Sequence, residues 1–195
     1  MTNTPQKTGL LLIISGPSGV GKTTITHQVV KDLEATFSVS MTTRPQTGSD
    51  VNGQDYQFVT EAQFQEHIKN NDLLEWANVF GNHYGTPRKP VEDALAQGKI
   101  IILEIDVQGA IKVKKKMPHA YSVFILPLSE GVLLKRLRAR GREDEATIQK
   151  RFQKARMEIS LANEARIYDQ FVINDVLEDA ISEIVNTVKK KQAHG

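Results

Sequence analysis

The stretch GPSGVGKTT (residues 16–24) follows the apolar run LLLIIS (residues 10–15) and decides how the chain is organised. It fits the pattern G-x-x-x-x-G-K-[ST], which ends here in Lys22 and Thr23. The glycines allow a tight turn in which successive backbone N–H groups face inward, and the N-terminus of a following helix adds partial positive charge. We therefore expect a loop that holds the phosphates of a nucleoside triphosphate largely through its backbone.

Two side chains of this loop have expected roles of their own. Lys22 would reach the β- and γ-phosphates, and the Thr23 hydroxyl would bind Mg²⁺. The whole loop is predicted to contact the triphosphate through Gly16, Pro17, Ser18, Gly19, Val20, Gly21, Lys22, Thr23 and Thr24.

The composition indicates one globular α/β domain with insertions. The chain has 195 residues, 39% hydrophobic and 25% charged, which is enough for one sizeable core. A formal net charge of +2 is too small to indicate nucleic-acid binding, and no apolar run approaches the ~20 residues of a membrane span. The absence of cysteine excludes thiol chemistry. Because residues 1–9 do not read as a signal peptide, we expect a cytoplasmic protein that binds neither nucleic acid nor membrane.

Strand-like and helix-like segments alternate along the chain, which favours a parallel sheet. Apolar runs typical of strands covered on both faces occur at residues 10–15, 99–106, 121–126 and 171–174, with a weaker one at 37–40. The clearest helix carries an apolar stripe formed by Leu177, Ala180, Ile181, Ile184 and Val188. Asp175 and Glu178 are placed as a capping box at its start.

Other stretches break this alternation. Residues 41–90 are too long for a crossover and predict an inserted lobe, and residues 138–151 combine arginines and acids in a predicted hairpin of helices. The lysine runs 114–116 and 189–191 lie near predicted helix ends, where we expect solvent-exposed charge that suits the helix dipole.

LEIDVQG (residues 103–109) ends the second strong strand beside the predicted phosphate loop. Asp106 lies at the carboxyl edge of that strand and is a candidate to orient Mg²⁺ through water or to polarise an acceptor phosphate. The same residues spell the D-x-x-G of a GTPase switch. A GTPase would also carry a downstream N-K-x-D, which the sequence lacks; its nearest string, Asn174-Asp175, has no lysine.

Four further strings complete an ordered series with the phosphate loop and LEIDVQG: SVSMTTRP (38–45), DYQFV (55–59), LLEWA (73–77) and GNHYGT (81–86). In this order and spacing the chain closely resembles guanylate kinases, the enzymes that transfer the γ-phosphate of ATP to GMP. The resemblance runs from about residue 10 to residue 188.

This resemblance implies an α/β fold of the P-loop NTPase type, a three-layer core with a parallel sheet, in a single domain. The core would comprise about residues 9–40, 98–135 and 152–191. An inserted GMP-binding lobe would span about residues 41–97, and a short helical lid about residues 136–151.

The same resemblance assigns the acceptor site. Arg44, Tyr56 and Tyr84 fall at the GMP phosphate, where a guanidinium can bind bidentately and tyrosine hydroxyls can donate. A carboxylate that accepts from guanine N1–H and N2–H₂ would reject adenine, which offers no such pair of donors. The residues that fall at the guanine are Ser40, Glu75, Thr86 and Glu104.

The lid and the last strand carry the remaining assignments. Similar enzymes swing lid arginines over the triphosphate, where they stabilise the transferring phosphoryl group; the arginines here are Arg136, Arg140, Arg142 and Arg151. Arg140 and Arg151 join Lys22 and Arg44 as the catalytic candidates. Arg136, Arg140 and Asn174 fall at ATP. Each arginine alone could instead pair with an acid of the EDE segment (143–145), and Asn174 could instead cap the last helix.

The chain departs from the resemblance at one position. Three residues after Arg44 similar enzymes carry a second basic residue, and here the residue is Thr47. A neutral hydrogen bond would replace charged ones, so we expect weaker binding of the GMP phosphate unless Arg88 or Lys89 substitutes.

The predicted substrates are ATP with Mg²⁺ as donor and GMP or dGMP as acceptor, for a monomer or homodimer. Two alternatives remain open. A guanylate-kinase-like interaction domain would bind a phosphopeptide in the GMP cleft, but such modules typically lack a working phosphate loop. A kinase of ribose bisphosphate would share the architecture and phosphorylate a sugar phosphate.

Overall fold

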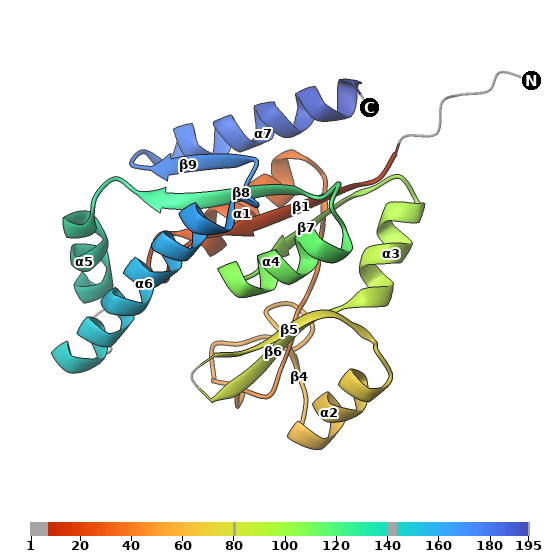
Figure 1. Cartoon of the computed structure of the whole chain (residues 1–195), viewed down its shortest axis with the longest axis horizontal. Coiled ribbons are helices and arrows are strands. Elements are labelled where there is room, and N and C mark those ends of the chain that lie inside the picture. Colours follow the sequence, from red (N-terminus) through yellow and green to blue (C-terminus); the bar gives the residue numbers. More distant parts are fainter. Residues whose placement is uncertain (1–7, 80, 140–143, 195) are drawn as a thin grey trace, which may run out of the picture.

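The computed structural model describes residues 8–79, 81–139 and 144–194 and has a five-stranded parallel sheet at its centre (Figure 1). The strand order is β2 (Thr36–Phe37), β7 (Ile100–Glu104), β1 (Leu10–Ser15), β8 (Tyr121–Pro127) and β9 (Gln170–Asn174). The four strong apolar runs are confirmed as strands. The weaker run is not: the strand there covers Thr36–Phe37 and ends before residue 38.

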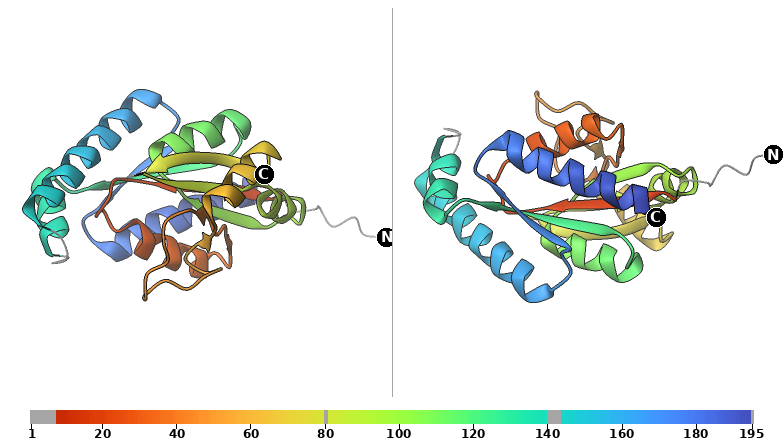
Figure 2. Two further views of the ribbon diagram at one scale, coloured as in Figure 1. Left: turned by 90° about the horizontal axis from the view of Figure 1, so that it is seen from below. Right: turned by 90° about the horizontal axis from the view of Figure 1, so that it is seen from above.

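Helices cover both faces of this sheet, which makes the predicted three layers (Figure 2). On one face lie α1 (Lys22–Asp32) and α7 (Leu177–His194), and on the other α3 (Arg88–Ala96), α4 (Val107–Lys116) and α6 (Glu145–Ala165). In β1, Leu12 and Ile14 pack toward α1 and α7, whereas Leu11 and Ile13 pack toward α3 and α4. Because side chains alternate along a strand, one apolar strand serves two cores. Within the described ranges, no helix is long and apolar enough to cross a membrane.

The final helix confirms its predicted stripe and corrects its predicted start. The stripe residues Ala180, Ile184 and Val188 are buried against the sheet. The Val176 carbonyl accepts the first helical hydrogen bond, from the Ala180 N–H at 3.2 Å, and the helix begins at Leu177. The start therefore lies one residue later than a capping box beginning at Asp175 requires, because the chain first bends out of β9.

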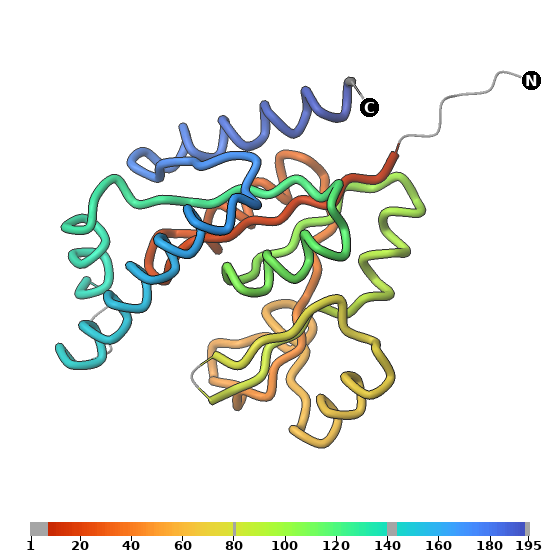
Figure 3. Tube along the Cα trace, viewed as in Figure 1, coloured from red at the N-terminus to blue at the C-terminus, as the bar shows by residue number. Residues whose placement is uncertain are grey.

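A second, smaller sheet lies below the core in Figures 1 and 3. Its strand order is β4 (Gln57–Phe58), β3 (Met41–Thr42), β6 (Asn82–Pro87) and β5 (Leu73–Val79), and helix α2 (Glu61–Lys69) packs on it. The pairs β3–β6 and β5–β6 are antiparallel. Met41, Phe64 and Leu73 form its small core. The region from residue 41 to residue 87 thus has its own sheet and its own apolar cluster.

Lysines of α4 join the two sheets. Lys116 Nζ donates to the Leu74 carbonyl at 2.6 Å, and Lys112 Nζ donates to the Trp76 carbonyl. Lys114, predicted to face solvent, instead pairs with Asp169 at 2.7 Å and is mostly buried. The prediction of a solvated lysine run was wrong for Lys114, because α4 packs against the loop before β9, whereas Lys115 and Lys116 are exposed and lie in the last turn of the helix as expected.

The remaining helix, α5 (Glu130–Ala139), forms a hairpin with α6. Leu133 and Leu137 of α5 pack against Ile148 and Ala155 of α6. The two helices project beyond the end of the sheet in Figure 1, with the N-terminal half of α6 turned outward. The predicted helical hairpin is therefore confirmed on both sides of residues 140–143, which lie outside the described part of the chain.

Candidate active site

The phosphate loop connects β1 to α1 at the carboxyl end of the central strand. Gly19 and Gly21 adopt left-handed backbone conformations, with φ of 86° and 98°, which favour glycine. A Cβ atom on Gly21 would also lie 2.7 Å from Nδ2 of Asn174. The same Asn174 amide donates to the Val20 carbonyl at 2.7 Å. The last residue of strand β9 therefore anchors the backbone of the phosphate loop.

A cavity of about 170 Å³ lies over this loop. Lys22 folds across the loop, with its Nζ 2.6 Å from the Gly16 carbonyl oxygen. Val20 is fully buried in the core beneath. The cavity is lined by Pro17, Ser18, Gly19, Gly21, Lys22, Thr23, Thr24 and Glu104. Most of the loop predicted to hold a triphosphate thus surrounds one polar hollow.

A larger cleft of about 380 Å³ runs from the loop to the second sheet. Its lining combines residues predicted for both substrates with residues from α6. The predicted residues that line it are Gly16, Ser18, Lys22, Ser40, Tyr56, Glu75, Tyr84, Glu104, Asp106 and Arg151. The fold therefore brings one end of a predicted triphosphate site and most of a predicted nucleotide site into a single cavity.

Glu75 of β5 is the buried acid of this cleft, with 5% of its surface exposed. Burial raises the pKa of its carboxyl to about 7, although a hydrogen bond from the Thr86 hydroxyl at 2.7 Å acts in the opposite direction. Thr86 is fully buried and does not line the cleft itself, so it contributes to the site through this hydrogen bond to Glu75. On the other side, Glu75 lies against Gly109 of α4. The acid is thus held between the second sheet and helix α4 of the core.

Two tyrosines form another part of the cleft lining, the tyrosine wall. The rings of Tyr56 and Tyr84 meet edge to face, with centroids 5.6 Å apart, and burial raises the pKa of Tyr56 to about 12. The guanidinium carbon of Arg44 lies 5.4 Å from the Tyr56 ring centre. Arg44 itself does not line the cleft; it pairs with Asp50 at 2.9 Å. A phenol hydroxyl can donate a hydrogen bond to an anion.

The lid arginines have different surroundings. Arg151 donates to the Ser18 hydroxyl at 2.6 Å and so contacts the phosphate loop. Arg136 donates to the carbonyls of Asn174, at 3.0 Å, and Val20, at 3.4 Å, behind the loop. Arg138, at the end of α5, pairs with Glu145 at 2.6 Å, which is the kind of ion pair that the sequence offered as the alternative role of an arginine in this segment. Arg140 and Arg142 lie outside the described residues.

Oxygen ligands gather at the foot of the loop. The Thr23 hydroxyl donates to Oε1 of Glu104 at 2.8 Å, and Asp106, in the same cleft, accepts from the Gly109 N–H at 2.8 Å as the N-cap of α4. Hydroxyl and carboxylate oxygens are ligands that suit Mg²⁺. Among the described residues, no three His, Asp or Glu side chains are grouped to hold a metal by themselves. An Mg²⁺ ion here would depend on phosphate oxygens and water as well.

Sequence reasoning missed two charged residues of the cleft, Lys154 and Glu158. Both follow Arg151 on one face of α6, at spacings of three and seven residues. Burial raises the pKa of Glu158, and its Oε2 has no hydrogen-bond partner in the described part of the chain. The signal that could have revealed them was this helical spacing from Arg151.

Comparison with known proteins agrees with this geometry. The family described as "Guanylate kinase" matches residues 8–191. Guanylate kinases of Carboxydothermus hydrogenoformans and Gloeobacter violaceus are 45% and 47% identical, over 90% and 89% of this chain and 85% and 84% of theirs. The crystal structure of guanylate kinase from Anaplasma phagocytophilum superimposes with a TM-score of 0.77 at 33% identity, covering 95% of this chain and 87% of that one. The chain belongs to the guanylate kinase family.

Proposed function

We propose that this member of the guanylate kinase family transfers the γ-phosphoryl group of ATP to GMP across the 380 Å³ cleft. The observation that carries the proposal is that this cleft joins Lys22 of the phosphate loop to the buried Glu75 of the second sheet. A phosphoryl donor at the loop and a purine acceptor at Glu75 would therefore meet inside one cavity.

Glu75 recognises the guanine base in this proposal. Its ionised carboxylate accepts hydrogen bonds from guanine N1–H and N2–H₂, and the Thr86 hydroxyl donates to its Oε1 at 2.7 Å. Adenine lacks that pair of donors, so its binding would leave a buried carboxylate unpaired. Ser40 and Glu104, which also line the cleft, complete the guanine contacts.

The acceptor phosphate binds at the tyrosine wall. Tyr56 and Tyr84 donate their hydroxyls, and Arg44, whose guanidinium carbon lies 5.4 Å from the Tyr56 ring centre, donates its N–H groups to the phosphate. Arg44 does not line the cleft in this structure, so its engagement requires the second sheet to move toward the core. Such closure also excludes water, which would otherwise hydrolyse ATP.

Transfer itself needs no covalent intermediate. A phosphate oxygen of GMP attacks the γ-phosphorus, the bond from that phosphorus to the β–γ bridging oxygen breaks, and ADP leaves with the electron pair. The acceptor oxygen is already anionic at neutral pH, so catalysis rests on positioning and charge neutralisation. Lys22 and Arg151, both in the cleft, supply positive charge to the transferring group, together with Arg140.

Magnesium is the proposed cofactor. Thr23 would coordinate it directly and Asp106 would hold it through water, since both present oxygens at the foot of the loop. When bound, Mg²⁺ neutralises the phosphate charges that build up during transfer. The adenine end of ATP would lie toward Arg136 and Asn174.

Further details of the proposal follow from the substrates. The acceptor contacts address base and phosphate and none is assigned to the ribose, so dGMP should serve as well as GMP. We place the enzyme in the cytoplasm, as a monomer or homodimer, acting on free nucleotides and on neither nucleic acid nor membrane.

A coupled ADP-release assay tests the function. ATP and Mg²⁺ are supplied with GMP, dGMP, AMP, UMP, CMP or ribose 1,5-bisphosphate, and Lys22→Ala serves as the blank. We expect turnover on the order of 1–100 s⁻¹ with GMP and dGMP alone. Faster turnover of the sugar bisphosphate would overturn the guanine assignments, and no turnover with any acceptor would favour an interaction domain.

A further inference from the structure

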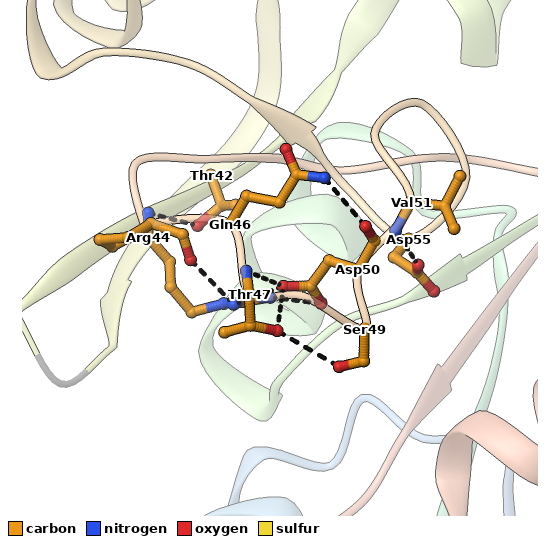
Figure 4. Close-up of polar contacts among 9 residues, drawn as sticks. Thr42, Arg44, Gln46, Thr47, Ser49, Asp50, Val51 and Asp55 are labelled. Carbon is orange, nitrogen blue, oxygen red and sulfur yellow. Dashed lines mark hydrogen bonds and ion pairs between the residues drawn. The ribbon is translucent and has the colours of Figure 1, made fainter.

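Polar side chains surround Arg44 in the connection between β3 and β4 (Figure 4), and two aromatic rings lie beside it. The Asp50 carboxylate binds the guanidinium through two bonds, Nη1 to Oδ2 at 2.9 Å and Nη2 to Oδ1 at 3.1 Å. Nη1 also donates to the Pro45 carbonyl at 3.0 Å. The ring centres of Tyr56 and Phe58 each lie 5.4 Å from Cζ. Arg44 is thus held along one edge by Asp50, and its guanidinium lies over the rings of Tyr56 and Phe58.

Thr47 holds Asp50 in turn. Oδ2 of Asp50 accepts from the backbone N–H and from the hydroxyl of Thr47, each at 2.7 Å. The hydrogen bonds from Arg44 and from Thr47 keep the pKa of Asp50 well below its usual range, so the carboxylate is charged at neutral pH. The Thr47 hydroxyl therefore serves Asp50, and does not replace the second basic residue that a phosphate clamp would use.

The second N–H edge of the Arg44 guanidinium group is not used by Asp50 or Pro45. A guanidinium carries five N–H groups, and the bonds to Asp50 and Pro45 take three of them. The remaining two, on Nε and Nη2, form the adjacent edge and have no hydrogen-bond partner in the described part of the chain. Two parallel N–H groups of this kind match two oxygens of a phosphate.

Resting on the proposed function, we propose that Asp50, supported by Thr47, is a positioning residue of the acceptor site that holds one edge of Arg44 and presents the other to the GMP phosphate. An arginine already held in place loses less side-chain freedom when its ligand binds. Asp50 also cancels the charge of Arg44, so the clamp relies on geometry more than on net charge. This chain has Thr47 where similar enzymes have a second basic residue, and it retains the fixed orientation of Arg44.

The variant Asp50→Asn tests this in the full-length protein, with GMP and guanosine titrated separately. An amide is the size of the carboxylate, but its NH₂ group would face a donor on Arg44 or on Thr47. We expect the GMP Kd to rise about tenfold, the loss of roughly one charge-assisted pair. Guanosine has no phosphate, so its Kd should be unchanged, which a general distortion of the lobe would not produce.

Matched variants separate the proposed role from charge and from folding. Asp55→Asn makes the same charge change in the same connection, where Asp55 accepts from the Val51 N–H at 2.7 Å; its GMP-to-guanosine Kd ratio should stay within about twofold of wild type. Thr47→Val should raise the GMP Kd about threefold, by loss of one supporting hydrogen bond. Asp50→Glu, which retains the charge, should recover part of the loss and guards against a folding defect in Asp50→Asn.

Dependence on Arg44 is the decisive control. In an Arg44→Ala background, Asp50→Asn should have no further effect on the GMP Kd. Tighter GMP binding by Asp50→Asn would show that the carboxylate competes with phosphate, and an unchanged Kd ratio would show a purely structural role; either overturns the proposal. Failure of the wild type to turn over GMP would instead overturn the proposed function, so the two failures are distinguishable.

Discussion

Gly109 of the core helix α4 lies directly against the carboxylate of Glu75 in the second sheet. A Cβ atom on Gly109 would come within 2.9 Å of Oε2 and 3.2 Å of Cδ of Glu75, distances at which something must shift. The helix thus leaves room for the acid that we propose to recognise guanine. The backbone N–H of Gly109 also donates a hydrogen bond to the carboxylate of Asp106, the N-cap of the same helix.

Gly109→Ala should therefore raise the GMP Michaelis constant about tenfold while kcat changes less, because the displaced Glu75 loses part of its contact with guanine. Steady-state kinetics with varied GMP measures both. Gly131→Ala is the matched control, since Gly131 also lies in the first turn of a helix but the nearest atom to its added Cβ would be Ser129 Oγ, at 3.9 Å. Equal Michaelis constants for the two variants would refute the contact.

GMP binding should strengthen with pH through about 7. Burial raises the pKa of Glu75 to about 7, and only the ionised carboxylate accepts both guanine hydrogen bonds. The ionised fraction grows about tenfold between pH 6 and pH 8, so the Kd should fall by a comparable factor. Calorimetric titration of GMP at several pH values measures this Kd. The variant Glu75→Gln should lose the pH dependence that comes from ionisation of Glu75 and retain any that comes from the GMP phosphate.

The same acid should destabilise the fold as pH rises. Its folded-state pKa lies above the ordinary value of 4.5, so between about pH 4.5 and 7 the folded chain binds the proton that the unfolded chain has lost. Stability therefore falls with pH across that window and levels off above it. Denaturant unfolding at pH 5 and pH 8 should show that Glu75→Gln removes this part of the decline; an identical decline in the variant would contradict the assignment.

Arg151→Ala should lower kcat by about 10²–10³-fold, as expected for removal of one group that stabilises the transition state. Its guanidinium donates to the Ser18 hydroxyl of the phosphate loop at 2.6 Å, so it already lies where the transferring group would be. The GMP Kd should change little. Arg156→Ala is a suitable comparison because Arg156 lies on the same helix and pairs with the exposed Glu130; similar kcat values for both variants would rule out the role.

Thr47→Arg should lower the GMP Michaelis constant several-fold, since it adds a positive charge where similar enzymes have one. The backbone N–H of residue 47 would still donate to Asp50, so the support of Arg44 is only partly lost. Kinetics with GMP and guanosine as competing ligands would measure the gain. An unaltered Michaelis constant and turnover would mean that Thr47 does not weaken the clamp.

Much of the core could be predicted because its signals are local. The phosphate loop requires small residues and a lysine at fixed spacing, and the apolar stripe of α7 follows from helical periodicity alone. The weak strand predicted at residues 37–40 and the capping box at Asp175 were misplaced by one to three residues, since hydrogen bonds to neighbouring strands and helices decide where an element ends.

The sequence by itself determined that a triphosphate loop opens a parallel α/β core, because backbone conformation and strand burial depend on neighbouring residues. Only the tertiary structure decided that Glu75 meets Gly109 and that Arg151 of α6 donates to Ser18 of the phosphate loop. Those contacts depend on how the second sheet and α6 pack against the core. The partners of these side chains come from elements that are far apart in the sequence, so no local pattern of residues predicts the contacts.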